Sequence, residues 1–381
     1  MSKTEFTFPV GYQDFHKDKG YNFQLNRYYS MGLGRFEDMK AAGQKINSIE
    51  EWNIEMLELA ETSVSEGRSM NAAFYYRAAE FYLLRDNPEK ELLYDKFVEY
   101  FSEATHTDEI DKYEVPYHDA FLPTIRVQPV DMSNRGTIVL HGGNDSFIQE
   151  LYPMIRYFSA QGYDVIAFEG PGQGAALKKY GLVLDIEWEK PTTAILDYFN
   201  LDDVTLIGLS MGGWLSLRAA AFELRIKRVI PWSVSFDVTQ YTNVVGQRLA
   251  GLFMRRFRNF VNKQMQKNMK KKLEYAWFVN NLMYMTKKDV PIEAFDVLMQ
   301  FNEENLHSDL VKQDVLILTG REDHLVPFKM HDLQVKALTN ARSVTSRVFT
   351  REDQAQNHCQ MGNLGLALDV MRDWIEEIQR L

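Results

Sequence analysis

The chain has 381 residues, of which 45% are hydrophobic and 25% charged, and its formal net charge is −10. This length exceeds one typical domain, so we expect a core with an appended or inserted second domain. The negative charge argues against nucleic acid as a partner, because neutralising phosphates requires a concentrated basic face.

The chain contains a single cysteine, Cys359, which excludes an intramolecular disulfide and is typical of a reducing compartment. Residues 1–6 lack an apolar run after a basic start, so we expect no signal peptide. The uncharged stretch between Asp203 and Arg218 is shorter than the about 20 apolar residues of a spanning helix. We therefore expect a cytoplasmic protein that neither spans nor binds a membrane.

Residues 1–110 are predicted to form an N-terminal helical domain. Ser48 has the pattern of a helix N-cap in a capping box, with the Glu51 side chain reaching back to the Ser48 amide. The following helix, over 71–83, mixes small and aromatic residues, a pattern that favours packing against neighbours on most sides. A third helix is expected over 88–101.

From about residue 111 the pattern changes to strands that alternate with helices. Such alternation, with apolar strands, predicts a mostly parallel sheet covered by helices on both faces. Pro116 and Pro123 indicate sheet-edge positions. The strands are expected at 113–118, 121–130, 136–140, 163–168, 204–207, 228–233, 315–318 and 343–349, before a last helix over 362–381. Residues 238–308 contain no clear strand and predict a helical cap inserted into the core of 111–381.

The strongest chemical motif is Gly208-Leu209-Ser210-Met211-Gly212, which lies between a predicted strand and an Ala-rich predicted helix. A sharp strand-to-helix turn can lift a serine above a sheet, and flanking glycines leave room for that turn. The alternative is a serine N-cap between two glycines. The strand–turn–helix context favours Ser210 as a catalytic nucleophile, which needs a base and donors for the oxyanion that it creates.

The partners of such a serine follow in the order acid, then histidine. Asp323 lies in the loop after strand 315–318 and is the preferred acid, with Glu322 as a minor rival and Asp237 as an alternative. His358 lies between the last strand and the last helix and is the preferred base. The alternative interpretation is that it is an ordinary polar loop residue. The neighbouring Cys359 is expected to serve packing.

Two further glycine-rich turns precede this motif in the sequence, each at the end of a predicted strand. The first, His141-Gly142-Gly143-Asn144, ends a strand, so the backbone amides of Gly143 and Met211 are the expected oxyanion donors, with His141 in a structural role. The second, over 170–175, matches the dinucleotide pattern G-x-G-x-x-G/A. The stiff Pro171 and the later Gly181 argue against a phosphate-binding helix, and favour a loop at the rim of the active site.

A basic run extends from Arg248 through Lys272 within the predicted cap. The ordinary interpretation is an amphipathic helix with a solvated basic face. A surface that attracts anionic substrates or lipids is the alternative.

With these residues in view, the chain resembles the α/β-hydrolases that carry an N-terminal helical domain, over nearly all its length. Named members of this group are 2,6-dihydroxypseudooxynicotine hydrolase, the fungal naphthopyrone chain-shortening hydrolases and the fermentation-respiration switch protein. The resemblance depends on 72–81, on His141-Gly142-Gly143 and on Phe168-Glu169-Gly170-Pro171-Gly172-Gln173-Gly174, with the Ser210 motif, Asp323 and His358. Glu169 stands where the family usually has Asp.

The resemblance implies an α/β-hydrolase fold with a pocket between helical domain and core, no metal or organic cofactor, and a homodimer. It implies cleavage of an ester, or of a C–C bond next to a carbonyl, in a small-molecule substrate. We expect an acyl-enzyme on Ser210 formed from an ester, amide or activated ketone of a bulky, partly aromatic molecule. The alternatives are an acylaminoacyl-peptidase-like hydrolase, acyl transfer to an acceptor other than water, or a non-catalytic ligand-binding protein on the same scaffold.

Overall fold

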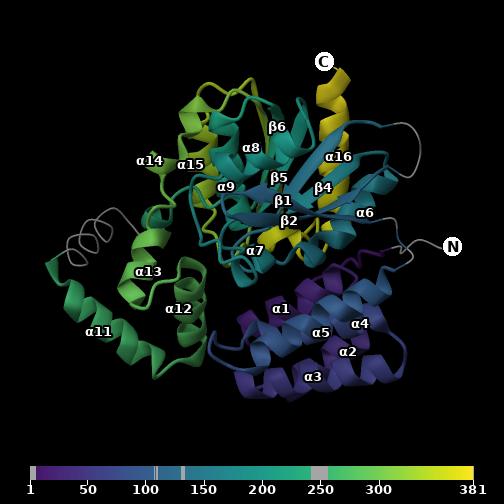
Figure 1. Cartoon of the computed structure of the whole chain (residues 1–381), viewed down its shortest axis with the longest axis vertical. Coiled ribbons are helices and arrows are strands. Elements are labelled where there is room, and N and C mark those ends of the chain that lie inside the picture. Colours follow the sequence, from purple (N-terminus) through teal and green to yellow (C-terminus); the bar gives the residue numbers. More distant parts are fainter. Residues whose placement is uncertain (1–5, 107, 109, 130–133, 242–255, 381) are drawn as a thin grey trace. The chain divides into compact units, whose positions relative to one another are not determined.

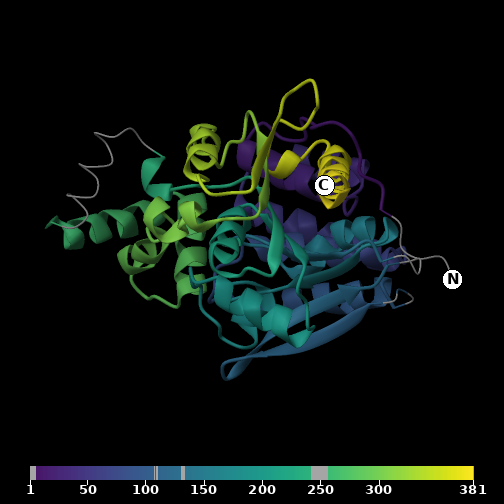
Figure 2. The same ribbon diagram turned by 90° about the horizontal axis from the view of Figure 1, so that it is seen from above.

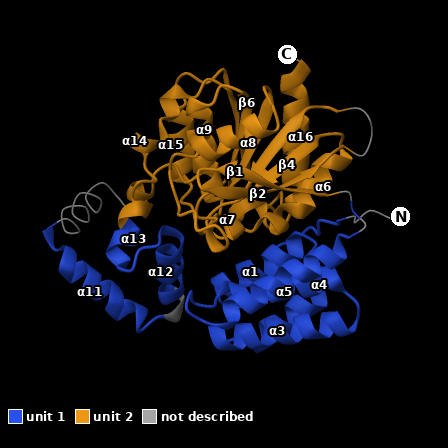
Figure 3. Cartoon of the chain, in the orientation of Figure 1, with its two compact units in different colours: residues 1–108, 250–295 blue, residues 109–249, 296–381 orange. Residues whose placement is uncertain are grey.

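The computed structural model describes residues 6–106, 108, 110–129, 134–241 and 256–380 (Figure 1). Its chain falls into two compact units, each built from two stretches of sequence (Figure 3). The first unit contains 1–108 and 250–295, and the second contains 109–249 and 296–381. The predicted domain boundary at residue 110 and the predicted cap over 238–308 stay predictions.

The described part of the first unit is helical. Helix α4 is its most buried element: small residues at 72, 73, 78 and 79 let its neighbours α3 and α5 approach closely. The helices are α1 (Lys19–Ser30), α2 (Phe36–Lys45), α3 (Ile49–Ser65), α4 (Ser69–Phe81), α5 (Glu89–Ala104), α11 (Arg258–Met269), α12 (Leu273–Thr286) and α13 (Pro291–Leu298), the last of which runs on into the second unit.

The start of α3 differs from the predicted capping box in one contact. Ser48 is the N-cap, and its hydroxyl accepts from the Glu51 amide at 3.1 Å, as expected. The Glu51 carboxylate accepts from the amide of Asn47 at 2.6 Å, not from that of Ser48. The Glu51 side chain therefore satisfies the backbone amide of Asn47, the residue before the N-cap, instead of the amide of Ser48.

Helix α12 is joined to the N-terminal helices by an aromatic side chain. The indole N–H of Trp277 donates to the carbonyl of Phe81 at 2.7 Å, and its ring stacks on the Phe81 ring with centroids 4.7 Å apart. Because this contact satisfies the indole N–H and packs a partly buried ring on the buried Phe81, it fixes a late segment of the sequence on α4. The grouping of 250–295 with 1–108 follows from such packing.

Part of the predicted basic run is observed as helix α11. The portion 248–255 lies outside the described residues. Within α11 and the turn after it the lysine side chains are exposed, while Met265 is buried. The described portion is therefore a helix with a basic, solvent-exposed outer face, on which the ring of Phe260 is exposed as well.

The second unit is built on one eight-stranded sheet in the order β1-β2-β4-β3-β5-β6-β7-β8. β1 and β2 form an antiparallel hairpin, β2 pairs antiparallel with β4, and the remaining pairs are parallel. The edge strands are β1 and β8, and in Figure 2 the blue hairpin that contains β1 lies on the opposite side of the sheet from the yellow-green strand β8. The strands are β1 (Asp111–Tyr117), β2 (Ala120–Val127), β3 (Thr137–His141), β4 (Asp164–Phe168), β5 (Val204–Leu209), β6 (Ile226–Trp232), β7 (Asp314–Gly320) and β8 (Ser343–Phe349).

Helices cover both faces of this sheet, because parallel strands require right-handed crossovers. The chain moves one way from β3 to β4 and the other way from β4 through β5 to β8, which places α6 on one face and α8, α9 and α15 on the other. α16 contacts α6 and so shares its face. The longer helices are α6 (Tyr152–Ala160), α8 (Glu189–Tyr198), α9 (Met211–Phe222), α15 (Lys329–Ala337) and α16 (Leu364–Arg380), and the short ones α7 (Gly174–Lys178) and α14 (Glu303–Leu306).

The predicted position of Pro123 at a sheet edge is wrong. β2 lies between β1 and β4, and is an interior strand. Proline is tolerated there because the pairing with β4 begins one residue later, at Thr124. Pro116 lies in β1, which is an edge strand as expected.

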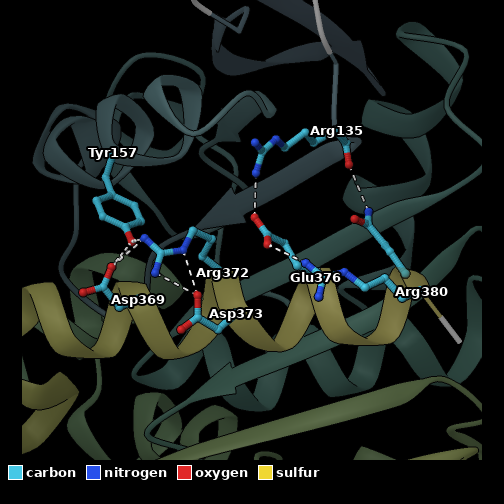
Figure 4. A network of polar contacts seen from close by, with 8 residues as sticks. Arg135, Tyr157, Asp369, Arg372, Asp373, Glu376 and Arg380 are labelled. Atoms are coloured by element: carbon cyan, nitrogen blue, oxygen red, sulfur yellow. Dashed lines mark hydrogen bonds and ion pairs between the residues drawn. The ribbon is translucent and has the colours of Figure 1, made fainter.

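Helix α16 is held against α6 and the start of β3 by a polar network (Figure 4). Arg372 donates to the hydroxyl of Tyr157 at 2.9 Å and pairs with Asp369 at 2.8 Å. Further along α16, Glu376 pairs with Arg135 at 2.7 Å. These contacts fix the helix that follows the loop of His358.

Among the described residues no helix is both long and apolar enough to cross a membrane.

Candidate active site

The candidate residues follow the carboxyl ends of four strands. Gly143 follows β3, Ser210 follows β5, Asp323 follows β7 and His358 follows β8. The strand order reverses at β3, and parallel sheets leave a crevice outside the carboxyl ends of the strands at such a reversal. Since all four strands are parallel, the fold brings residues more than 200 positions apart to one edge of one unit.

Ser210 occupies the sharp turn that the glycine pattern predicts. Its backbone has φ 58° and ψ −122°, a left-handed conformation that a side chain rarely adopts, and helix α9 begins at the next residue. A Cβ on Gly208 would lie 2.0 Å from the carbonyl oxygen of Gly212, so only glycine fits there. The Ser210 amide donates to the carbonyl of Trp232 at 2.8 Å, which anchors the turn to β6.

A chain of two hydrogen bonds links the three predicted residues. His358 Nε2 lies 2.8 Å from Ser210 Oγ, and His358 Nδ1 lies 2.7 Å from Asp323 Oδ2. The side chains of His358 and Asp323 are 5% and 1% exposed, whereas Ser210 is partly exposed. This arrangement gives the hydroxyl a base within proton-transfer distance and the base a buried partner.

The buried side chains of His358 and Asp323 each stabilise the charged form of the other. Burial lowers the pKa of His358, but the charge and hydrogen bond of Asp323, together with contributions from Cys359, outweigh it and raise that pKa well above 6.5. Burial raises the pKa of Asp323, and the charge and hydrogen bond of His358, with the amides of Val326 and Leu325, bring it below its ordinary value. Asp323 therefore stays ionised and favours the imidazolium that proton transfer from Ser210 would create.

The rival acids lie elsewhere. Glu322 is on the exposed side of the same loop and pairs with Arg351 at 2.6 Å. The carboxylate of Asp237 accepts from the amides of Thr239 at 2.7 Å and Glu303 at 3.2 Å, and so caps short helical turns. The carboxylate bonded to His358 is that of Asp323.

The loops of the acid and the histidine are packed directly on each other. A Cβ on Gly320 would lie 2.3 Å from the carbonyl oxygen of Asn357, so the backbones approach as only glycine permits. The amide of Glu322 donates to the carbonyl of Gln356 at 2.8 Å. On the other side, the buried Cys359 donates its amide to Ser233 Oγ at 3.0 Å. Cys359 thus packs the histidine loop against β6.

The predicted oxyanion residues are also adjacent. A Cβ on Gly143 would lie 3.0 Å from the amide nitrogen of Met211 and 3.0 Å from Ser210 Cβ. Met211 is the first residue of α9, whose first amides have no acceptor within the helix and carry its positive dipole end. The two backbone segments that carry the Gly143 and Met211 amides therefore meet beside Ser210.

A family model described as "Alpha/beta hydrolase family" matches residues 137–351, which is more than half of the chain and contains Gly143, Ser210 and Asp323. The chain belongs to the alpha/beta hydrolase family.

Its relatives include fungal proteins. Hydrolase acrC of Aspergillus aculeatus is 27% identical over 289 residues, which cover 65% of this chain and 65% of acrC, just under two thirds of that relative's length. Hydrolyase poxO of Penicillium oxalicum is 26% identical over 351 residues, which cover 80% of this chain and 83% of poxO. These matches confirm the predicted resemblance to fungal hydrolases.

Two solved structures share the fold over nearly the whole chain. The 2,6-dihydroxy-pseudo-oxynicotine hydrolase has a TM-score of 0.65 at 20% identity and covers 92% of this chain and 94% of its own. AbyA5 has a TM-score of 0.68 at 17% identity and covers 93% and 94%. The predicted fold class, a mostly parallel sheet with helices on both faces and a helical N-terminal region, is confirmed.

In this hydrolase the turn at 169–174 supplies two side chains to which sequence reasoning gave no role. Gln173 is buried, and its Nε2 donates to the carbonyl of Gly142 at 2.7 Å and to that of Gly143 at 3.2 Å. Glu169 is buried and accepts from the amides of Ile148 at 2.8 Å and Ala175 at 2.6 Å. The Gly-Pro-Gly-Gln-Gly pattern was the only local sign that this turn matters. It does not indicate that the glutamine reaches the turn after β3.

His141 has the structural position expected of it. Its ring is fully buried against Phe168 and Trp188, and burial lowers its pKa to about 4. A neutral ring can donate from Nδ1 to the Gly142 carbonyl, 3.1 Å away. His141 therefore supports the turn that carries Gly143.

No cluster of three or more potential metal ligands occurs among the residues that the structure describes.

Proposed function

We propose that this hydrolase forms an acyl-enzyme on Ser210. The observation that carries the proposal is the hydrogen-bonded series Asp323–His358–Ser210, at 2.7 and 2.8 Å, on a strained turn at the carboxyl edge of the sheet. The strain fits a nucleophile, because such a backbone persists only where the surrounding structure enforces it.

The first half of the reaction transfers an acyl group to the enzyme. His358 Nε2 takes the proton of Ser210 Oγ as that oxygen bonds to the substrate carbonyl carbon, whose π electrons move onto the carbonyl oxygen. The Gly143 and Met211 amides would stabilise this oxyanion. When the carbonyl reforms, the bond to the leaving group breaks, and that group takes the proton held by His358.

The second half releases the acyl group to water. His358, neutral again, takes a proton from a water molecule whose oxygen attacks the acyl carbon. Collapse of the second tetrahedral intermediate breaks the bond to Ser210 Oγ, which recovers the proton, and an acid leaves. Throughout, Asp323 accepts from Nδ1–H and stabilises the charged imidazole.

We propose as substrate an ester, amide or activated ketone of a bulky, partly aromatic small molecule. A C–C bond would break by the same steps only if a carbonyl or aromatic ring delocalised the departing carbanion. The name of one structural relative gives 2,6-dihydroxy-pseudo-oxynicotine as the compound on which that protein acts, which supports testing activated ketones here.

The nucleophile is tested with a fluorophosphonate probe and mass spectrometry of the labelled peptide. We expect one adduct on Ser210 that is lost in Ser210→Ala. The matched control is Ser216→Ala on the same helix α9, because Ser216 is buried and donates to the carbonyl of Gly213 at 3.0 Å. That variant should label like the wild type. Folded wild-type protein that does not label would refute the proposal.

The bond type is tested separately with aryl esters, acyl amides and β-diketones. Turnover of one class, abolished in Ser210→Ala, identifies the leaving group. Adding an alcohol or amine and analysing the products distinguishes hydrolysis from acyl transfer, since an acceptor that competes with water yields a new ester or amide.

A further inference from the structure

The peptide unit between Gly142 and Gly143 determines where one proposed oxyanion donor points. In a trans peptide the carbonyl of the first residue and the N–H of the second point in opposite directions within one plane. Holding the Gly142 oxygen therefore fixes the direction of the Gly143 N–H. Glycines on both sides of this peptide give it little rotational restraint of its own.

The restraint comes from two side chains that reach the Gly142 oxygen: His141 through Nδ1 at 3.1 Å, and Gln173, which makes the shorter contact. The Gln173 amide nitrogen donates to the Gly142 oxygen at 2.7 Å and to the Gly143 oxygen at 3.2 Å, so it holds the carbonyls on both sides of the donor. Its own oxygen accepts from the amide of Gly170 at 3.1 Å. All of these atoms belong to buried residues, where hydrogen bonds are strong and their loss is costly.

A second buried side chain of the same turn fixes the far end of the oxyanion loop. Glu169 accepts from the amide of Ile148, and a Cβ on Gly174 would overlap the Glu169 carboxylate, so this group is tightly enclosed. The turn over 169–174 thus holds the segment 142–148 at both ends.

We propose that Gln173 is a positioning residue of the oxyanion hole, which orients the Gly143 N–H toward the oxyanion of the substrate by holding the Gly142 carbonyl. This inference rests on the proposed acyl-enzyme function. Gln173 acts through the backbone and touches neither Ser210 nor His358 in the described contacts. Its loss is expected to weaken transition-state stabilisation and to leave the serine and its base intact.

The chain offers a matched control in Gln313. It too is buried, its Nε2 donates to a backbone carbonyl, that of Ala220, at 2.7 Å, and its oxygen accepts from the amide of Lys312 at 2.8 Å. Gln313→Met therefore removes the same type of contact as Gln173→Met, but at the amino end of β7, opposite the carboxyl ends that carry the candidate site.

The test measures the second-order rate of fluorophosphonate labelling across pH, because phosphonylation also places an oxygen in the oxyanion hole. For Gln173→Met we expect the plateau rate to fall about 10- to 100-fold, the size of effect that a small misplacement of a catalytic group produces. The pH midpoint should equal that of the wild type, since the base is unaltered. Gln313→Met should keep both values.

Gln173→Glu provides a second measurement should the methionine variant fail to fold. Glutamate keeps the acceptor for Gly170 but donates to Gly142 only when protonated. The ratio of its labelling rate to that of the wild type should therefore rise as the pH falls, which a purely structural role would not produce.

The outcomes separate the two proposals. A wild type that labels at Ser210, with an equal plateau rate in Gln173→Met or a pH-independent ratio in Gln173→Glu, overturns the role of Gln173 alone. A midpoint shift in Gln173→Met also overturns it, because the residue would then act on His358. Folded wild-type protein that does not label removes the acyl-enzyme function, and this inference with it.

Discussion

Replacing Asp323 with asparagine changes one atom of the proposed site and should reverse the protonation pattern of the histidine. Asp323 Oδ1 accepts from the amides of Leu325 and Val326, each at 2.9 Å, while Oδ2 faces His358 Nδ1. The two amides require an acceptor, so the asparagine oxygen takes the place of Oδ1. Its NH2 group must then face Nδ1.

This orientation determines the size of the effect. With a donor opposite Nδ1, the neutral ring carries its proton on Nε2, which faces Ser210 Oγ at 2.8 Å. The base is then already occupied by a proton and cannot accept that of the serine. A tautomer error of this kind costs on the order of 10⁴-fold in rate, which corresponds to about 5 kcal/mol of transition-state stabilisation.

The assay is the rate of fluorophosphonate labelling at Ser210, with the melting temperature as a check on folding. Glu322→Gln is the matched control, because it neutralises the neighbouring carboxylate, which pairs with the exposed Arg351. We expect that variant to label within a few-fold of the wild type. A folded Asp323→Asn protein that labels within tenfold of the wild type would refute the reasoning.

Three further predictions follow from the same structure. The wild-type labelling rate should still be rising above pH 6.5, because the raised pKa of His358 keeps the base protonated there; a rate already constant from pH 6 upward would contradict this. Burial raises the pKa of Glu169 from 4.5 to about 7, so its contribution to stability is greatest below pH 4.5 and is lost as the pH rises through 7. Urea unfolding should show the wild type losing about 3 kcal/mol between pH 4.5 and 8 relative to Glu169→Gln; a constant difference between the two proteins would argue against a buried titrating carboxyl. Trp277→Phe should destabilise the first unit by about 1–2 kcal/mol by leaving the Phe81 carbonyl unpaired. An unchanged melting temperature would show that this contact does not hold α12.

Local patterns determined most of the sheet and of the site. β8 has the predicted bounds, and the other strands lie within a few residues of theirs, because apolar runs between glycine-rich turns have few alternatives in a covered parallel sheet. The Ser210 turn was predictable because the glycines at 208 and 212 mark positions where the tight turn leaves no room for a side chain. The order of serine, acid and histidine was predictable because it follows from the order of strand ends.

Other features depended on contacts that no local pattern encodes. Asp323 was preferred to Glu322 and Asp237 from position alone, whereas the distances show which carboxylate faces the histidine. The interior position of β2 is a property of strand order, which proline signals cannot report. The grouping of 250–295 with the N-terminal helices depends on residues such as Trp277 meeting a helix almost 200 positions earlier.

The sequence by itself therefore determined the fold class and indicated the proposed nucleophile Ser210, because both follow from short motifs and their order. The tertiary structure alone decided what surrounds that serine. Gln173 lies 30 residues from Gly143 in the sequence, and its amide reaches that turn only because β3 and β4 are neighbours in the sheet. Long-range pairing brings such groups together, and no single segment of the chain specifies it.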